Sequence, residues 1–219
     1  MVSPDIFIQF CIMEKLDLTK QFKEYYKATA KPALLTLAPA NYLSITGKGD
    51  PSGDAFAADI QAIYPLAYTI KFMCKEQDND FVVPKLEADW WYDETRYKDI
   101  TAEQASTSIP RSEWLYRLLI RMPDFVSPEM AASAIETVVN KKGIHGSAKV
   151  EWYSTPKQQV VQALHTGPYS TEPETIKRII DFMQQRNLAK GGHHHEVYLS
   201  DFRKTAPEKL KTILREPVA

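Results

Sequence analysis

The sequence has few cysteines, no excess of positive charge and no long apolar run. Its two cysteines, Cys11 and Cys74, fit neither a zinc site nor a redox motif, so we expect reduced thiols, as in a cytoplasmic protein. The net charge is −1 and Lys and Arg form no cluster, which argues against nucleic acid or an anionic membrane as a partner. No apolar segment approaches the length that spans a bilayer, about 20 residues.

The first 40 residues are expected to be an extension and a linker. Residues 1–12 are apolar but have no basic region and no small-residue cleavage site, so a secretory signal is not expected. Residues 16–26 are lysine-rich and predict a short amphipathic helix, and residues 31–39, which contain two prolines, predict a linker. No helix-turn-helix and no basic recognition helix is found here, which argues against the sensing module of a DNA-binding regulator.

The remaining residues alternate between strand and helix patterns. A length of 219 residues with 44% hydrophobic content is enough for one large domain or two small halves. We expect a kink at Pro65 and a polar connection over residues 93–110. The expected strands are 41–47, 81–92, 114–122, 148–154, 158–165, a short strand within 191–201, and 210–217, with the fifth and fourth paired as a hairpin. The expected helices are 54–75, 127–142 between Ser127 and Gly143, and one that follows a capping box at 171–174.

This order of elements contains a repeat. Each half has a strand that ends in glycine (Gly47, Gly167), a helix, a strand that carries an acid (Glu87, Glu196), and a closing strand. The repeat predicts an α+β fold of two tandem βαββ modules, 41–123 and 148–217, joined by a connecting helix in 124–147. Two such modules related by a pseudo-twofold axis would form a ligand cleft between them, with the two acids at roughly symmetric places.

Glu196 is the principal candidate for a functional residue. Period-2 alternation places His194, Glu196 and Tyr198 on one strand face and His195 and Val197 on the other. A carboxylate beside a phenol is suited to anchor a cation, or to act as a general acid or base if burial raises its pKa. The alternative is a solvent-facing glutamate on a half-buried strand.

Other residues have two interpretations each. Glu87 is either a second catalytic acid or the partner of a lysine or arginine. Aromatic side chains stack on flat polycycles and attract cations, but each is also a common core residue. Trp90 and Trp91 point to opposite faces of their strand, so at most one of them should face the cleft. The candidate ligand-binding aromatic residues are Tyr64, Tyr68, Trp90, Trp91, Trp114, Tyr169 and Tyr198.

The run His193-His194-His195 raises the question of a metal site. Neighbouring histidines on a strand do not converge on one ion, and no accompanying set of ligands is found. Residue order also supports no Ser-His-Asp or Cys-His arrangement. We therefore predict neither a metal nor a cofactor.

Four stretches together resemble a known family. They are 64–72, 84–91, 167–169 and 195–201, and with residues 205–217 they cover most of 40–217 in the family's order. The chain resembles the GyrI-like (gyrase-inhibitor-like) small-molecule-binding proteins, a domain also found as the effector-binding half of multidrug-responsive transcription regulators. Pro65 departs from the pattern, in which glycine or a helix former is expected.

The resemblance implies a function as well as a fold. It implies two βαββ (SHS2-like) modules with an aromatic cleft and a glutamate at its base, which Glu196 matches, for sequestering or sensing bulky hydrophobic, aromatic or cationic compounds. The alternative is a detoxifying hydrolase, because stand-alone members with the double tryptophan are similar to proteins that open the cyclopropane of cyclopropanoid DNA-alkylating compounds. In that reading Glu196 activates water. The sequence predicts no oligomeric state.

Overall fold

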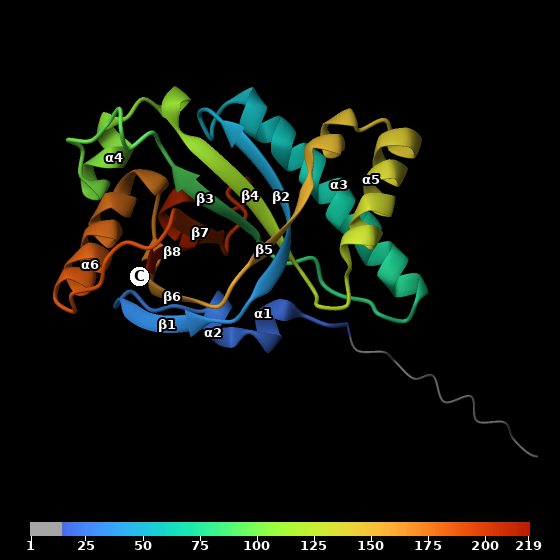
Figure 1. Cartoon of the computed structure of the whole chain (residues 1–219), viewed down its shortest axis with the longest axis horizontal. Helices are drawn as coiled ribbons and strands as arrows, with labels where there is room; N and C mark the ends of the chain where they lie inside the picture. The colour runs from blue at the N-terminus through green and yellow to red at the C-terminus, as the bar shows by residue number, and fades with distance from the viewer. Residues whose placement is uncertain (1–14) are drawn as a thin grey trace, which may run out of the picture.

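The fold is an eight-stranded antiparallel sheet that curls, with helices packed on it (Figure 1). The computed structural model describes residues 15–219, so the predictions for residues 1–12 and for Cys11 lie outside the described residues. The strand order is β1-β6-β8-β7-β3-β4-β2-β5. This architecture of helices on an antiparallel sheet confirms the α+β part of the predicted fold class, whereas the division into two βαββ modules stays a prediction. The order also places β3 and β7, the strands that carry Glu87 and Glu196, side by side at the centre of the sheet.

The strands are β1 (Ala33–Leu37), β2 (Ala40–Lys48), β3 (Leu86–Trp91), β4 (Leu115–Met122), β5 (Glu151–Thr155), β6 (Gln158–Thr166), β7 (His194–Tyr198) and β8 (Lys211–Val218). The α-helices are α1 (Leu18–Gln21), α2 (Lys23–Tyr26), α3 (Asp54–Glu76), α4 (Ala102–Ser108), α5 (Pro128–Lys142) and α6 (Glu172–Gln184). Short 3-10 turns precede β4, β5, α6 and β8.

Different helices cover the two faces of the sheet. We call one the helix face, because α3 packs there on β2 and β4 and α6 packs on β6 and β8, with α5 against α3. Its side chains include Ala88, Leu118 and Leu214. We call the other the tyrosine face, because Tyr25 and Tyr26 of α2 pack on it. The alternation of side chains along each strand assigns every residue to one face or the other.

Helix α3 and the strands beneath it form the largest core cluster. Ile63, Leu66 and Ile70 of α3 are fully buried. The helix runs unbroken through Pro65, so the expected interruption does not end it. Glycine is required at position 47, because the ring of Tyr116 occupies the space that a side chain would fill. A Cβ atom at Gly47 would lie 2.3 Å from the Tyr116 hydroxyl oxygen.

Both predicted ends of α5 are confirmed. The Ser127 side chain accepts a hydrogen bond from the backbone N–H of Met130, which satisfies a free donor of the first turn. Gly143 ends the helix in the left-handed conformation, with φ of 69°. These ends were predictable because each depends on residues within one helical turn.

Two predictions about connecting segments are wrong. The segment 31–39 is not a linker, because Ala33–Leu37 forms edge strand β1 and pairs with β6. The two prolines lie just outside the strand, where they interrupt no hydrogen bond of the ladder. The polar connection 93–110 contains α4, which packs against α6 and begins with a capping box at Thr101.

The predicted hairpin of 148–165 is also wrong. β5 pairs with β2, whereas β6 pairs with β1 and β8, so the short turn between them joins distant parts of the strand order. At α6, Thr171 makes no side-chain capping bond; its hydroxyl donates to the Pro168 carbonyl instead. The helix begins at Glu172.

Cys74 is a free thiol buried in the core, with its Sγ atom 3.4 Å from Met130 Sδ. None of the helices in residues 15–219 has the length and apolar content needed to cross a membrane.

Candidate functional site

Glu196 lies near the centre of the sheet, on the helix face. Its neighbours in register are Ala88 on β3 and Leu214 on β8, both fully buried. Glu196 itself is only 8% exposed. A carboxylate in such a position is costly unless charged or hydrogen-bonding groups surround it. The predicted alternation is confirmed, but the alternative of a solvent-facing glutamate is wrong.

His194 connects Glu196 to a second acid. Its Nδ1 atom lies 2.5 Å from Glu216 Oε1, and its Nε2 atom lies 3.4 Å from Glu196 Oε1. Burial alone would lower the pKa of His194, but the charges of Glu216 and Glu196 raise it well above the usual range. The imidazole is therefore an imidazolium at neutral pH, placed between two carboxyl groups.

Glu172, the first residue of α6, completes this acidic cluster. It is 8% exposed, and its Oε1 atom has no hydrogen-bond partner among the described residues. Burial, and then the charge of Glu196, raise the pKa of Glu172 well above its usual range. A helix N-terminus ordinarily favours a charged acid, but here burial outweighs that effect. Burial therefore favours the protonated form of Glu172.

Aromatic side chains border the acids. Trp90 donates its indole N–H to the Tyr198 hydroxyl over 3.0 Å. Tyr169 meets the Tyr198 ring edge-on, with centroids 6.2 Å apart. Burial and the charge of Glu196 raise the pKa values of Tyr169 and Tyr198, so both phenols keep their protons. Glu196 thus faces neutral hydroxyl groups and aromatic rings.

Three further predicted residues lie farther out. Trp114 packs edge-on against Trp90, with centroids 6.4 Å apart. Tyr64 on α3 is half-buried, and this burial raises its pKa; its neighbours include Tyr68 and the loop residue Arg203. Tyr68 is 46% exposed. The large apolar and aromatic side chains that remain exposed include Tyr68, Phe72, Tyr169 and Phe202.

Two predicted site residues lie on the tyrosine face instead. Trp91 stacks on His193 with ring centroids 4.6 Å apart, so only Trp90 of the pair is on the Glu196 side. Glu87 pairs in register with Val197, one residue after Glu196, and alternation turns its side chain away from Glu196. The structure therefore does not bring Glu87 and Glu196 together, and the expected cleft between them is not formed by these two acids.

The residues that do gather around Glu196 were only partly visible in the sequence. Strand alternation places His194 on the same face, whereas Glu172 falls within the predicted capping box and Glu216 within the predicted closing strand. The period-2 pattern of β8 does place Glu216 on the same face as Leu214, so that signal was present. Nothing local indicates that Glu172 is buried.

The three consecutive histidines diverge. His193 stacks on Trp91, His194 contacts Glu216, and His195 lies on the other face between Asp89 and Glu87. Within residues 15–219, no group of three or more His, Cys, Asp or Glu side chains is arranged to hold a metal ion.

The cluster on the helix face holds a set of groups suited to proton transfer. The pKa values of Glu172 and His194 are both raised, which favours a proton on each, and the carboxyl group of Glu196 lies close to both. Such a set can neutralise a bound cation, or can accept and donate protons within one site. Burial beside the aromatic rings strengthens these electrostatic effects.

A curled antiparallel sheet with helices packed on it defines an α+β domain, and the family is established by the sequence as a whole. The chain belongs to the GyrI-like family: the model of the GyrI-like small molecule binding domain matches residues 30–219. No curated protein matches the sequence.

Solved structures agree with this family. An uncharacterized conserved protein from Listeria innocua is 35% identical with a TM-score of 0.83, and the match covers 94% of this chain and 100% of that one. A structure described as a hydrolase from Listeria innocua is also 35% identical, with a TM-score of 0.80 and the same coverage. The EcmrR C-terminal domain is 12% identical with a TM-score of 0.53, over 86% of this chain and 97% of that one, and shows the fold alone.

Proposed function

We propose that the protein binds bulky aromatic or cationic small molecules at Glu196, for sequestration or sensing of toxic compounds. The observation that carries the proposal is a buried glutamate bordered by Trp90, Tyr169 and Tyr198 in a small-molecule-binding domain. A cation near Glu196 would be attracted by the carboxylate and by the faces of the aromatic rings.

The ligand would enter from the side where exposed aromatic residues lie. Tyr68 and Phe202 are exposed, and Tyr64 is close to Tyr68 and to Arg203 beside Phe202. Because Glu196 and Trp90 are each less than a tenth exposed, binding requires these outer side chains to move apart. The pseudo-twofold arrangement of two βαββ modules would place this opening between α3 and α6. The strand orders β2-β4-β3 and β6-β8-β7 support that arrangement, since they mirror each other about the β3–β7 pair.

A second candidate function is hydrolysis of a strained, electrophilic ring, such as the cyclopropane of cyclopropanoid DNA-alkylating compounds. It is supported by the 35%-identical protein described as a hydrolase and by the protonated Glu172 beside Glu196. Glu196 would take a proton from water while the water oxygen bonds to a ring carbon. The ring carbon–carbon bond would break, and its electron pair would accept a proton from Glu172.

The binding proposal is tested with crystal violet, an aromatic cation, and leucocrystal violet, its reduced form, which is uncharged at pH 8 and keeps the three dimethylaminophenyl rings. Titration calorimetry should show tighter binding of the cation, and Glu196→Gln should weaken cation binding at least tenfold. Glu208→Gln makes the same chemical change at an exposed position and should leave binding unchanged. Equal affinity for both compounds, or a cation affinity unaffected by Glu196→Gln, would contradict the proposal.

Turnover separates the two candidate functions. The protein is incubated with a cyclopropanoid alkylator, and ring-opened product is followed by mass spectrometry in excess substrate. Many product molecules per protein, lost in Glu196→Gln and in Glu172→Gln, support hydrolysis. Stoichiometric binding without product supports sequestration or sensing alone.

A further inference from the structure

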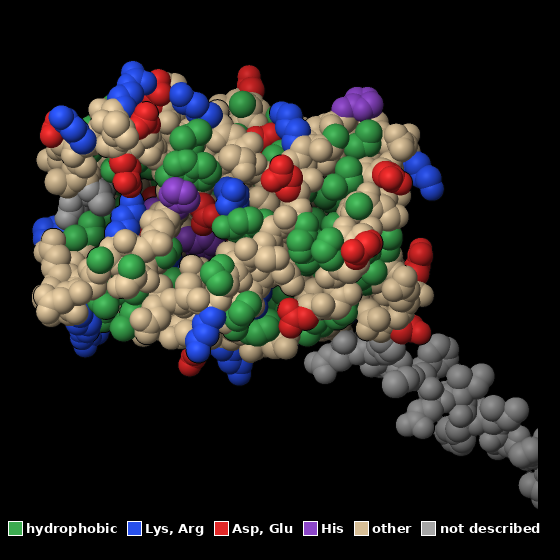
Figure 2. Space-filling view, viewed as in Figure 1, with side chains coloured by type: hydrophobic (Ala, Val, Ile, Leu, Met, Phe, Trp, Pro, Cys, Tyr) green, Lys and Arg blue, Asp and Glu red, His purple; other side chains and the backbone are tan. Residues whose placement is uncertain are grey.

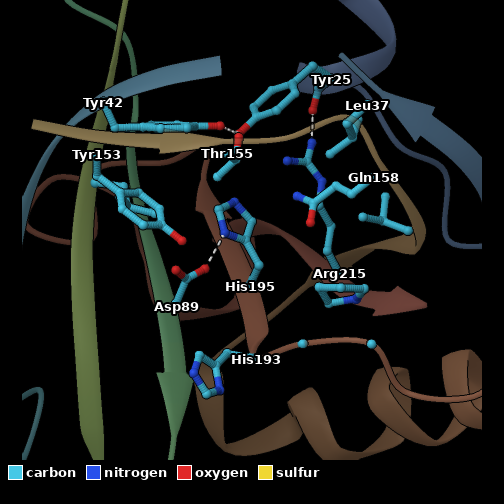
Figure 3. A pocket seen from close by; sticks show the side chains of 15 residues that line it. Tyr25, Leu37, Tyr42, Asp89, Tyr153, Thr155, Gln158, His193, His195 and Arg215 are labelled. Carbon is cyan, nitrogen blue, oxygen red and sulfur yellow. Dashed lines mark hydrogen bonds and ion pairs between the residues drawn. The ribbon is translucent and has the colours of Figure 1, made fainter. Parts of the chain in front are cut away.

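A cavity lies on the tyrosine face, on the opposite side of the sheet from Glu196 (Figure 3). Its volume is about 210 Å³, which exceeds the roughly 150 Å³ of a cavity known to hold benzene. Figure 2 shows a hollow in this side of the molecule, with histidine and acidic side chains inside it. Its walls include the phenols Tyr25, Tyr42 and Tyr153 and the apolar side chains Leu37 and Val160.

A row of charged side chains crosses four strands on this face, and three of them, Asp89, His195 and Arg215, line the cavity. Arg117 on β4 is in register with Asp89 on β3, Asp89 with His195 on β7, and His195 with Arg215 on β8. These four side chains share the tyrosine face because each is the register partner of the next.

The acids on this face already have partners. His195 contacts Asp89 through Nδ1, at 2.8 Å, and Glu87 through Nε2, at 3.0 Å. Glu87 also accepts hydrogen bonds from the hydroxyl groups of Tyr25 and Tyr26. Because both imidazole nitrogens face carboxylates, His195 is the cation of this group, and Glu87 is fully buried among its donors.

Arg215 is only partly satisfied. Its Nε atom donates to Gln162 Oε1 over 2.7 Å, and its Nη2 atom donates to the backbone carbonyl of Tyr25. Arg215 is only 1% exposed, and its buried Nη1 atom has no hydrogen-bond partner among the described residues. In Figure 3 this third nitrogen points into the space between Tyr25 and His195. A buried guanidinium N–H without an acceptor is costly, so an acceptor that entered the cavity would bind favourably.

The face carries more positive than negative charge. The guanidinium carbon of Arg117 lies 4.1 Å from the centroid of the Tyr153 ring, and that of Arg121 lies 4.0 Å from the centroid of the Phe22 ring. Neither arginine forms an ion pair with an acid in residues 15–219. With Arg215 and His195 these make four cations on the central strands of this face, against the two acids Glu87 and Asp89. Of the four, Arg215 and His195 line the cavity, whereas Arg117 and Arg121 lie outside its lining and act on it at longer range. The excess charge favours an anion over a cation or a neutral compound.

We propose that this cavity is a second binding site, for a small organic carboxylate. The Gln158 side chain, which lines the cavity beside Arg215, would move aside and give access to the buried Nη1 atom. The carboxylate would then accept a hydrogen bond from Arg215 Nη1, and a compact aromatic or aliphatic body would pack on the phenols, Leu37 and Val160. The site would be separate from the Glu196 cluster, because the central strands lie between them. It would prefer anions, whereas the Glu196 cluster would prefer cations.

Charge preference is tested on the unaltered protein with three compounds of the same size. Benzoate, benzamide and benzylamine differ in charge but share the ring, and calorimetry should show benzoate binding at least tenfold more tightly than either of the others. Benzoate should not displace crystal violet. Equal binding of benzamide, preference for benzylamine, or displacement of crystal violet would overturn the proposal.

The position of the site is tested with adjacent glutamines on β6. Gln158 lines the cavity, and Figure 3 shows it beside Arg215, whereas Gln159 is exposed. Gln158→Glu supplies Arg215 with a carboxylate from the protein itself and should reduce benzoate affinity more than tenfold. Gln159→Glu adds the same charge outside the cavity and should leave affinity within twofold. Equal affinity in both variants would place benzoate elsewhere and overturn the proposal.

Discussion

Trp90 and Tyr198 form a hydrogen bond that links the two central strands of the sheet. The indole N–H of Trp90 donates to the Tyr198 hydroxyl over 3.0 Å, on the same face as Glu196. The bond has two effects: it satisfies the only polar group of a buried tryptophan, and it fixes the Tyr198 ring beside the acidic cluster.

Tyr198→Phe should therefore destabilise the protein. The ring is kept, but the indole N–H loses its acceptor in a buried site, which costs about 1–3 kcal/mol in the free energy of unfolding. Urea denaturation followed by tryptophan fluorescence measures this change. Tyr68→Phe removes a hydroxyl from an exposed ring and serves as the control, with an expected change below about 0.5 kcal/mol. Equal stabilities of the two variants would show that the hydrogen bond contributes nothing.

The sequence was informative where the signal is local. The alternation of His194, Glu196 and Tyr198 was predicted correctly, because a strand has only one side-chain period. The ends of α5 at Ser127 and Gly143 are also predictable, because a helix cap depends on residues within one turn of the helix end. The opposite directions of Trp90 and Trp91 also follow from alternation alone.

What could not be predicted depends on distant pairing. Nothing near Thr155 indicates that β5 pairs with β2 while β6 pairs with β1 and β8. The repeat predicts symmetric places for Glu87 and Glu196, but a one-residue offset in the register between β3 and β7 turns the two side chains to opposite faces. Glu172 was assigned to a helix start, where acids are common, and its burial arises only when α6 packs on the sheet.

His195 should make stability depend on pH. Burial alone lowers its pKa, but hydrogen bonds to Asp89 and Glu87 raise it above the usual value of 6.5. The folded protein then binds a proton that the unfolded chain releases near pH 6.5. The stabilising contribution of His195 is thus fully present below that pH and is lost as pH rises through the folded-state pKa.

Urea denaturation at several pH values between 5.5 and 9 tests this dependence. His195→Gln should be less stable than the original protein at pH 6, and its free energy of unfolding should fall less steeply towards pH 9. His145→Gln changes an exposed histidine and should leave the profile unchanged. Parallel profiles for His195→Gln and the original protein would contradict the assignment of a raised pKa.

Gly47→Ala, a substitution in β2, should destabilise the folded protein. The new Cβ would lie 2.3 Å from the Tyr116 hydroxyl oxygen, so the ring must move and its hydrogen bond to Asp59, now 2.7 Å, would break. We expect a loss of about 1–3 kcal/mol, as for other overpacked sites. In a double-mutant cycle with Tyr116→Leu, most of this loss should disappear. If the loss is the same with leucine at 116, the ring is not its cause.

Glu172→Gln should make the free energy of unfolding depend less on pH. Burial and the charge of Glu196 hold the pKa of Glu172 well above 4.5, so the folded protein retains a proton that the unfolded chain releases near that pH. Stability from this group is therefore complete below about pH 4.5 and declines as pH rises, by about 1.4 kcal/mol for each unit of pKa difference.

Glutamine has the same shape and cannot ionise, so the variant should lose this decline. Compared at pH 5 and pH 8 by urea denaturation, Glu172→Gln should lose less stability over that interval than the original protein. The difference between the two pH values is the decisive quantity, because any fixed cost of burying the amide cancels in it. Glu174→Gln, at an exposed position of the same helix, should follow the original protein. If Glu172→Gln also followed it, Glu172 would be ionised in the folded state and could not supply the proton that ring opening requires.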